Sequence, residues 1–351
     1  MNLEETIQKR RNNLRADRLD MSFGELMNIY EDKSLIITPE YQRTFRWDIF
    51  QQTRFIESIL LGIPVPPIFV AEDDKGKWEL VDGLQRISSI FSFFGLLTEN
   101  ETKNNLILEE GDLIEELKGK TVNNIGILLK NSIKRSVCRV EIIKWDSDVD
   151  MRYELFNRLN TGGSPLSEQE IRNCIFRGHS NELNSLLIDI GTSELFRNII
   201  KPTDKQIEEM FCEELVLRFY TFKNDSLKLE KNLPNHLSSY MRRVAKQEIG
   251  FDKLAEQECI EKYLNYLNNN FDYTIFRASN GIFTPNYFDA IMLSLNKYWT
   301  QYENNSEAFE NKISELKTSP EYKDAGLSAY SQSRIESRVL KAFEIFDPNG
   351  N

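Results

Sequence analysis

The sequence predicts an α+β protein, in which a small mixed sheet with its helices is followed by a mostly α-helical domain. Two observations support this fold class. Short segments in which polar and apolar residues alternate, the period of a β-strand, occur in the first half of the chain. From residue 180 onward, apolar residues instead recur at three- and four-residue steps, the period of an amphipathic helix. We therefore expect two domains, residues 1–178 and 179–351.

The first domain begins with two predicted helices. Residues 1–20 are expected to form a charged helix, and Ser22–Tyr30 a short one that buries Phe23, Leu26 and Met27. The first helix would carry five basic residues that could contact DNA, namely Lys9, Arg10, Arg11, Arg15 and Arg18. A solvated helix face explains these charges as well, and we favour that explanation.

Short apolar segments bounded by glycine and proline predict the sheet. Strands are expected at residues 35–37, 68–71, 77–81 and 136–143, with the second and third forming a hairpin. A helix follows Trp47 and ends at Gly62 and Pro64. We assign no chemistry to the mixed segment at residues 95–135.

The turn Asp82-Gly83-Leu84-Gln85-Arg86 lies between the strand at 77–81 and a helix with a buried apolar face. The first N–H groups of a helix lack intrahelical partners and lie at the positive end of its dipole, so a glycine-containing turn there can hold a phosphate. Arg86 adds donors that match phosphate oxygens. Asp82 could hold a metal ion, orient a water or cap the helix. Taken alone, the five residues favour the simpler explanation, a helix cap and a surface arginine.

A second polar motif lies farther along the chain. The helix predicted at Asp148–Leu159 ends in Asn160-Thr161-Gly162-Gly163, and a capping box at Ser167–Glu170 begins the next helix. This joint needs no function to explain it. After it, helices are expected at residues 205–223, 236–248, 253–269, 285–303, 305–317 and 332–346. Their aromatic residues are expected in the core, and Glu213, Glu214 and Arg218 are candidates for a buried ion pair.

Composition limits the function. The net charge of −11 argues against a protein that wraps DNA by charge alone. The four cysteines form no CxxC pair and the chain has two histidines, His179 and His236, so a zinc site is not expected. No apolar run has the ~20 residues of a membrane span, and the N-terminus lacks the apolar core of a secretory signal. A cytoplasmic location is therefore expected.

Three motifs in order identify a family resemblance. The segments PEYQRTFRW (39–47), FIESILLGIPVPPIFVAE (55–72) and ELVDGLQR (79–86) resemble the N-terminal domain of GmrSD-type restriction enzymes, a branch of the ParB/sulfiredoxin-like superfamily. The resemblance continues through LFNRLNTGGSPLSEQEIRN (155–173) and EELVLRFYTF (213–222). It implies a ParB/sulfiredoxin-like sheet and a nucleotide-binding, NTP-hydrolysing domain used in bacterial anti-phage defence.

Comparison within the superfamily defines the turn further. Sulfiredoxins have Gly-Cys-His-Arg at a similar turn, and here Leu84 takes the place of the cysteine, which excludes sulfinic-acid reduction at this position. ParB-type members have Gly-Glu-Arg-Arg and bind a nucleoside triphosphate. The GmrSD-type pattern is Asp-Gly-Gln-Gln-Arg, of which this chain keeps all but the first Gln. If that Gln orients the attacking water, the chain binds nucleotide without rapid turnover.

The resemblance implies a site in which Gly83 and the helix N-terminus hold phosphates that Arg86 and Arg43 clamp. Asp82 would hold Mg²⁺ or position a water, and Gln42 and Gln85 would hydrogen-bond phosphate or base. The catalytic candidates are Asp82, Gln85 and Arg86. We expect four residues of the second motif to line the same pocket, namely Asn157, Arg158, Asn160 and Thr161.

The HNH-type nuclease module that commonly follows this domain is not recognised here, because neither histidine lies in a metal-binding pattern. Both histidines are expected to be ordinary surface or cap residues. A separate nuclease subunit could supply cleavage. The competing hypotheses are a non-catalytic DNA- or partner-binding module with a vestigial nucleotide pocket, and an antitoxin-like scaffold without a ligand. The sequence leaves homo-oligomerisation open.

Overall fold

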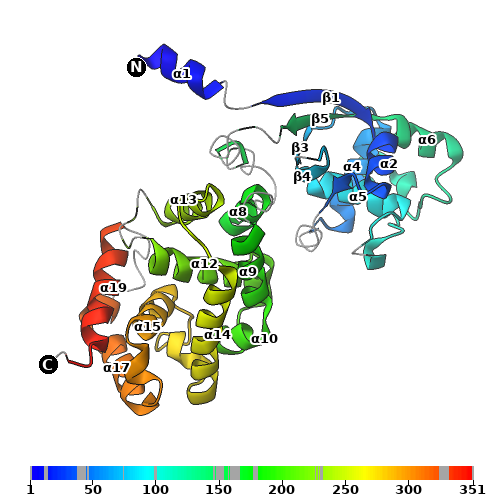
Figure 1. Ribbon diagram of the computed structural model, residues 1–351. Coiled ribbons are helices and arrows are strands. Elements are labelled where there is room, and N and C mark those ends of the chain that lie inside the picture. Colours follow the sequence, from blue (N-terminus) through cyan, green and yellow to red (C-terminus); the bar gives the residue numbers. More distant parts are fainter. Residues whose placement is uncertain are drawn as a thin grey trace. The chain divides into compact units, whose positions relative to one another are not determined.

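The computed structural model describes residues 2–11, 15–37, 45, 47–73, 75–98, 101–144, 147, 154–156, 158, 167–176, 181–225, 227, 229, 232–323 and 332–349. Contacts within the chain divide it into two compact units, Met1–Pro165 and Leu166–Asn351 (Figure 1). Among the helices in the described ranges, none combines the length and the apolar character needed to cross a membrane.

The first unit contains a mixed sheet, as predicted. Its strands are β1 (Ala16–Ser22), β2 (Leu35–Ile36), β3 (Ile68–Glu72), β4 (Trp78–Asp82) and β5 (Val137–Ile143). They lie in the order β1-β5-β3-β4-β2. β1 pairs antiparallel with β5, and β3 pairs antiparallel with β4, whereas the β3–β5 and β4–β2 pairs are parallel. The predicted hairpin is confirmed as β3–β4, and it contains β3, the central strand of the sheet.

The first unit also contains the helices α1 (Leu3–Arg11), α2 (Phe23–Glu31), α4 (Ile49–Leu60), α5 (Leu84–Phe94) and α6 (Ile127–Arg135), with short 3₁₀ helices at Glu101–Lys103 and Glu115–Leu117. α2 packs against β1 and β2, and α4 packs against α5 and α6. Capping boxes begin α2 at Ser22 and α4 at Asp48, because each side chain accepts a bond from the third helical N–H. The predicted inward residues Phe23, Leu26 and Met27 are buried.

The predicted helix over residues 1–20 is wrong for residues 16–20. Ala16–Ser22 forms the edge strand β1, with Arg18 bound to Glu141 at 3.0 Å and Asp20 bound to Arg139 at 2.9 Å across the β1–β5 pair. This edge strand is exposed and carries charged residues on both faces, so its sequence lacks the alternation of polar and apolar residues that indicates a strand. For this reason the sequence favoured a helix. Arg15 and Arg18 therefore do not lie on one helix with Lys9–Arg11.

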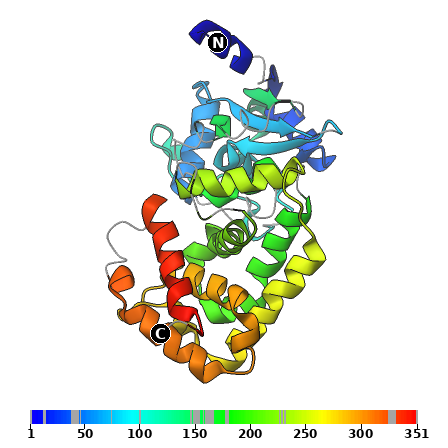
Figure 2. The same cartoon turned by 60° about the vertical axis from the view of Figure 1, so that its left-hand side comes forward.

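The second unit is helical, as predicted. Its helices are α8 (Glu168–Phe176), α9 (Asn181–Thr192), α10 (Glu194–Ile200), α11 (Asp204–Glu208), α12 (Phe211–Asn224), α13 (Leu233–Ala245), α14 (Lys253–Asn270), η3 (Tyr273–Phe276), α15 (Pro285–Lys297), α16 (Trp299–Tyr302), α17 (Ser306–Thr318), α18 (Pro320–Lys323) and α19 (Gln332–Phe346). α12 lies in the middle and contacts α8, α9, α10, α13 and α15 (Figure 2). Phe219 and Tyr220 on α12 are fully buried, which confirms the predicted aromatic core.

Two expectations for this unit are corrected. Glu213, Glu214 and Arg218 do not pair among themselves: Arg218 forms a buried ion pair with Asp289 of α15, and Glu214 binds Arg172 of α8 at 3.0 Å. Spacing within one segment could not reveal partners on other helices. His236, expected at a surface or cap, is 2% exposed and stacks on Phe222.

The boundary between the two units lies before α8, between Pro165 and Leu166. α8 packs on α12 and α13, so it belongs to the second unit. The sequence had placed it in the first domain, residues 1–178. The predicted domain ranges, 1–178 and 179–351, stay a prediction.

Candidate functional site

The candidate site is built on the turn that joins β4 to α5. Strand β4 ends at Asp82, and Gly83 adopts a left-handed conformation with φ of 99° before α5 begins at Leu84. A Cβ atom on residue 83 would lie 2.5 Å from Cγ2 of Ile68 on β3. Both the backbone conformation and the neighbouring strand therefore require glycine at this position. Strand, turn and helix agree with the sequence prediction.

Asp82 and Arg86 form an ion pair across this turn. Nη2 of Arg86 lies 2.8 Å from Oδ2 of Asp82, and Nη1 donates to the carbonyls of Pro66 and Pro67, the latter at 2.9 Å. The Arg86 side chain is 14% exposed, and that of Asp82 is 42% exposed. Three of the five guanidinium N–H groups are thus used to hold the segment before β3 against the turn.

Gln85 connects the turn to the Pro39–Trp47 motif. Its Oε1 accepts a hydrogen bond of 3.0 Å from the backbone N–H of Trp47. The backbone carbonyl of Trp47 is also bound, because it accepts a hydrogen bond of 2.9 Å from Nε2 of Gln52 on α4. The C-terminal end of the motif is therefore held between α4 and α5. Gln42 and Arg43, which the sequence assigned to the site, lie outside the described residues.

A residue from the segment without assigned chemistry also holds this motif. Nζ of Lys103 donates to the Phe45 carbonyl and lies 4.9 Å from the centroid of the Phe45 ring. Phe45 itself is 3% exposed. Neither Lys103 nor Gln52 was predicted as a site residue. Gln52, on the first turn of a recognised helix beside an aromatic residue, offered a weak signal, and Lys103 offered none.

The second predicted motif is described only in part. Arg158 is helical and exposed, with Nε 3.6 Å from Glu154. Asn157, Asn160 and Thr161 lie outside the described ranges, so their place in the same pocket stays a prediction. The capping box after the joint is confirmed: Glu170 N–H donates to Oγ of Ser167 at 3.2 Å, and Ser167 N–H donates to Oε2 of Glu170 at 2.6 Å.

Thiol chemistry is disfavoured next to this turn. Cys138 on β5 is fully buried, and burial raises the pKa of its thiol to about 11, against the opposing charge of Arg86. A thiol with such a pKa stays protonated at neutral pH and is a poor nucleophile. The environment of Cys138 thus agrees with the conclusion drawn from Leu84, that sulfinic-acid reduction is not the chemistry of this site.

Asp82 is the candidate ligand for a metal ion. Among the residues with described positions, no three His, Cys, Asp or Glu side chains gather as a metal site. Mg²⁺ in nucleotide sites is commonly held by one or two carboxylates together with phosphate oxygens and waters. The single, partly exposed carboxylate of Asp82 at the N-terminus of α5 could hold Mg²⁺ together with a nucleotide in this way. It could not form a metal site from protein ligands alone.

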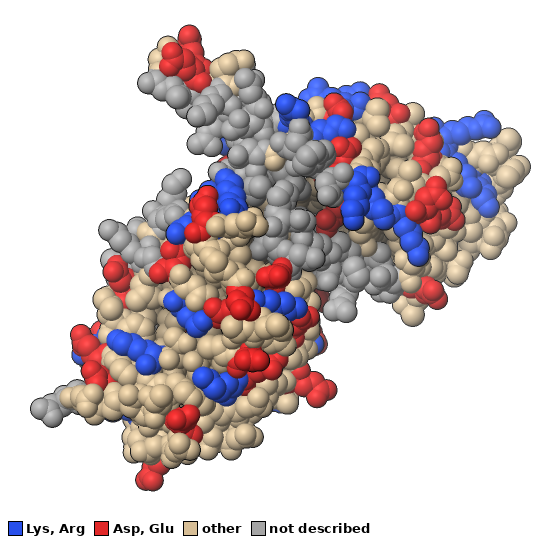
Figure 3. All heavy atoms as spheres, viewed as in Figure 1, with Lys and Arg blue, Asp and Glu red and all other residues tan. Residues whose placement is uncertain are grey.

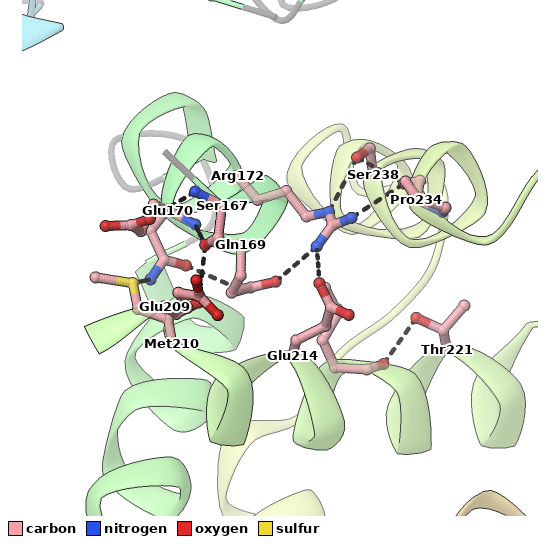
Figure 4. A network of polar contacts seen from close by, with 12 residues as sticks. Ser167, Gln169, Glu170, Arg172, Glu209, Met210, Glu214, Thr221, Pro234 and Ser238 are labelled. Atoms are coloured by element: carbon pink, nitrogen blue, oxygen red, sulfur yellow. Dashed lines mark hydrogen bonds and ion pairs between the residues drawn. The ribbon is translucent and has the colours of Figure 1, made fainter. Parts of the chain in front are cut away.

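Arg172 of α8 is the centre of a buried polar network in the second unit (Figure 4). Its guanidinium is fully buried and donates to Oγ of Ser238, Oε1 of Gln169 and Oε2 of Glu214 at 2.9–3.1 Å. These bonds tie α8 to α12 and α13. The network lies at the C-terminal end of the LFNRLNTGGSPLSEQEIRN segment, where the sequence indicated only the capping box.

Comparison with known proteins supports the predicted relationship. Residues 23–177 match the family model described as "GmrSD restriction endonuclease, N-terminal domain". The match contains the sheet strands β2–β5, the β4–α5 turn and α8. No curated protein and no solved structure matched the chain. The ordered motifs, the geometry of the turn and the family match agree, and residues 23–177 therefore carry a GmrSD-type restriction endonuclease N-terminal domain.

Proposed function

We propose that this chain is the nucleotide-binding component of a bacterial anti-phage restriction system and that the β4–α5 turn is its nucleotide site. The observation that carries the proposal is the contact between Trp47 and Gln85, which joins two motifs that lie 38 residues apart. It brings the stem of a Gln- and Arg-containing loop to the N-terminus of α5. A phosphate at that terminus would have donors from both motifs within one site.

The turn has the features of a phosphate site. Gly83 contributes no side-chain cap to α5, so the first N–H groups of the helix are not bound by the residue that usually caps them. The helix dipole adds positive potential at the same point. Arg86 lies one helical turn from Gly83, and two of its five N–H groups are not used by its bonds to Asp82, Pro66 and Pro67, so they would be the donors to an anion at this turn.

Hydrolysis is the second part of the proposal. Mg²⁺ would be held by Asp82 together with the phosphates, and would supply positive charge that stabilises the leaving group. Asp82 also orients Arg86 through their ion pair, so the carboxylate has a structural role besides any catalytic one. Because Leu84 occupies the position of the first Gln in the family pattern, we propose that turnover is slow relative to binding.

Cleavage of DNA is proposed to require a separate nuclease subunit. A general-base histidine must reach solvent and substrate. His236 is buried within the helical unit and stacks on the Phe222 ring at a centroid distance of 6.2 Å, so it cannot do so in this conformation. The other histidine, His179, lies outside the described residues. DNA and a nuclease subunit are proposed as partners of the chain.

One observation favours the competing function, a non-catalytic binding module. Arg86 already donates three hydrogen bonds within the chain, and a structural role of that kind is what a vestigial pocket would retain. In that case the turn would hold the β3 segment in place, and the chain would act through a partner or through DNA.

Binding and hydrolysis of ATP, GTP and CTP by the purified chain, with and without Mg²⁺ and DNA, test the proposal. The variants are Asp82→Asn and Arg86→Ala, with Arg277→Ala on the second unit as a control, and thermal unfolding shows whether each folds. Turnover that both site variants lose supports an NTPase. Metal-dependent binding without turnover supports a nucleotide-controlled switch, and no binding of any nucleotide favours the binding module.

A further inference from the structure

Two neighbouring segments of the first unit expose apolar side chains beside charges of opposite sign. The first, here called the acidic segment, is residues 107–116, in which Ile107 is 54% and Leu113 74% exposed. The second, here called the α6 face, is made of Ile127, Leu128, Lys130, Lys134 and Arg135. Ile127 and Leu128 are 67% and 81% exposed. Contiguous exposed apolar side chains are typical of an interaction surface, and Ile127 and Leu128 are adjacent on α6.

The acidic segment is held rigidly. The carboxylate of Glu57 on α4, whose residue is 3% exposed, accepts the backbone N–H groups of Asp112, Leu113 and Ile114 at 2.7–3.2 Å. A Cβ on Gly111 would lie 2.3 Å from Oε1 of Glu57, so this approach requires glycine. A buried carboxylate therefore fixes the loop that exposes Leu113.

The charges of the acidic segment are only partly neutralised within the chain. Asp112 binds Arg54 at 3.0 Å, and Glu110 lies 3.7 Å from Lys118. Glu115 and Glu116 are exposed and form no ion pair with a described residue. Two carboxylates beside an exposed leucine thus remain available to a partner.

The α6 face has the complementary character. Lys130, Lys134 and Arg135 form no ion pair within the part of the chain that the structure describes, and α6 contains no acidic residue. Ile127, Lys130 and Lys134 follow each other at three- and four-residue steps and so form one stripe. Lys130 and Lys134 line a groove of about 520 Å³ between α2 and α6. Its lining also includes the apolar Met27, Phe94 and Val122 and one acidic residue, Glu31, so the two lysines outnumber the single carboxylate.

Both surfaces lie beside the same helix. α6 packs on α4, and the acidic segment is bound to α4 through Glu57 and through Thr53, whose hydroxyl accepts the Glu109 N–H at 3.0 Å. Figure 3 shows basic and acidic side chains next to each other at the end of the first unit where α6 lies. The two surfaces carry unpaired charges that do not neutralise each other within one chain.

We propose that this chain forms a two-fold symmetric dimer through the first unit, in which the acidic segment of each copy docks on the α6 face of the other. A two-fold axis uses every contact twice, so one reciprocal arrangement satisfies both surfaces of both chains. Leu113 of one copy enters the groove of the other, and Glu115 and Glu116 meet Lys130, Lys134 and Arg135. The occupant is a second copy because one chain carries both complementary halves.

Charge reversal tests this arrangement. Sedimentation velocity over a concentration series gives the apparent dimer dissociation constant of the full chain. Lys134→Glu and Glu116→Lys are each expected to raise that constant about tenfold or more, because like charges then face each other at both symmetry-related contacts. Lys75→Glu, the same change in the β3–β4 turn, is the control and is expected to have no effect.

Mixing the Lys134→Glu and Glu116→Lys variants distinguishes the proposed interface from any other interface. In a dimer of one Lys134→Glu chain with one Glu116→Lys chain, one contact pairs the two new charges and the other is native, so association is restored. Leu113→Ser is expected to weaken association without any change of charge. A wild-type chain that stays monomeric at the highest concentrations tested overturns the proposal, as does a dimer that the charge reversals leave unchanged.

Discussion

The backbone N–H of Trp47 donates a hydrogen bond of 3.0 Å to Oε1 of Gln85, which joins the end of one polar motif to the first turn of α5. The bond gives Gln85 a positioning role, since the stem of the Pro39–Trp47 motif depends on it. A glutamine that only contacted a ligand would leave this stem unaffected when it is replaced.

Replacement of Gln85 tests this role. Gln85→Leu keeps the size of the side chain but leaves the Trp47 N–H without its acceptor, at a cost of about 1–3 kcal/mol in the free energy of unfolding. Gln85→Glu keeps an acceptor and is expected to cost less. Hydrogen exchange at the Trp47 amide is the direct measurement. Equal exchange in wild type and Gln85→Leu would show that the bond does not hold the stem.

Gly83→Ala is expected to be among the most damaging single substitutions in the first unit. The left-handed φ of 99° is strained for alanine, and the new Cβ would lie 2.5 Å from Cγ2 of Ile68. Denaturant unfolding should show a loss of about 2–4 kcal/mol. Gly62→Ala is the matched control, because Gly62 has a φ of 72° but no atom within 4 Å of the added Cβ. It isolates the backbone strain, and the difference between the two variants measures the steric clash.

Much of this site could be predicted from sequence because its signals are local. The alternation in β4, the glycine and the apolar period of α5 each depend on adjacent residues, and they fixed the turn correctly. The proline partners of Arg86 could not be predicted, since Pro66 and Pro67 lie in the segment before β3 and accept through their backbone carbonyls. Lys103 was missed for the same reason: its segment has no periodic pattern, and its bond to the Phe45 carbonyl depends on tertiary structure.

The edge strand β1 shows a second reason why a sequence-based prediction fails. Its residues are mostly exposed on both faces, so no hydrophobic period distinguishes strand from helix, and its pairing with β5 includes cross-strand charge pairs such as Asp20–Arg139. In the second unit, helix positions followed from periodicity, whereas the partners of Arg172 and Arg218 on distant helices did not. Local sequence patterns predict where helices and strands form. The partners in a buried charge pair can be identified only when the arrangement of those helices in space is known.

Arg172 provides a prediction for the helical unit. Arg172→Met leaves Glu214 and Ser238 without their donor inside the protein and is expected to lower the free energy of unfolding by about 3 kcal/mol. The double variant Arg172→Met/Glu214→Leu removes both charges and is expected to recover much of that loss. Chemical denaturation of the two variants and of Glu214→Leu forms a double-mutant cycle. Additive losses would mean that the pair contributes no coupling energy.

The buried thiol of Cys138 predicts a dependence on pH. Burial raises the pKa of Cys138 to about 11, whereas an unfolded cysteine has a pKa of about 8.5. Between these values the unfolded chain has lost the proton that the folded chain keeps, so stability falls as pH rises from about 8.5 to 11. Cys138→Ala removes this contribution, and its stability should decline less steeply over that range in urea titrations at successive pH values. A parallel decline in both proteins would assign the loss to other groups, such as Cys212, whose pKa burial raises to about 12.

Leu84→Gln tests the link between the turn and hydrolysis. It restores the glutamine of the family pattern at the first position of α5, where the Leu84 side chain is only partly buried and a glutamine can be accommodated. If the missing amide orients the attacking water, the variant should hydrolyse nucleotide faster, while nucleotide affinity changes little, because the phosphate site proposed above consists of Gly83, Arg86 and the helix N-terminus. Single-turnover hydrolysis beside equilibrium binding separates the two effects, and Leu84→Met serves as a control of similar size without the amide. Equal turnover in all three proteins would mean that position 84 does not limit the reaction, and a change in affinity alone would place its side chain against the bound nucleotide instead.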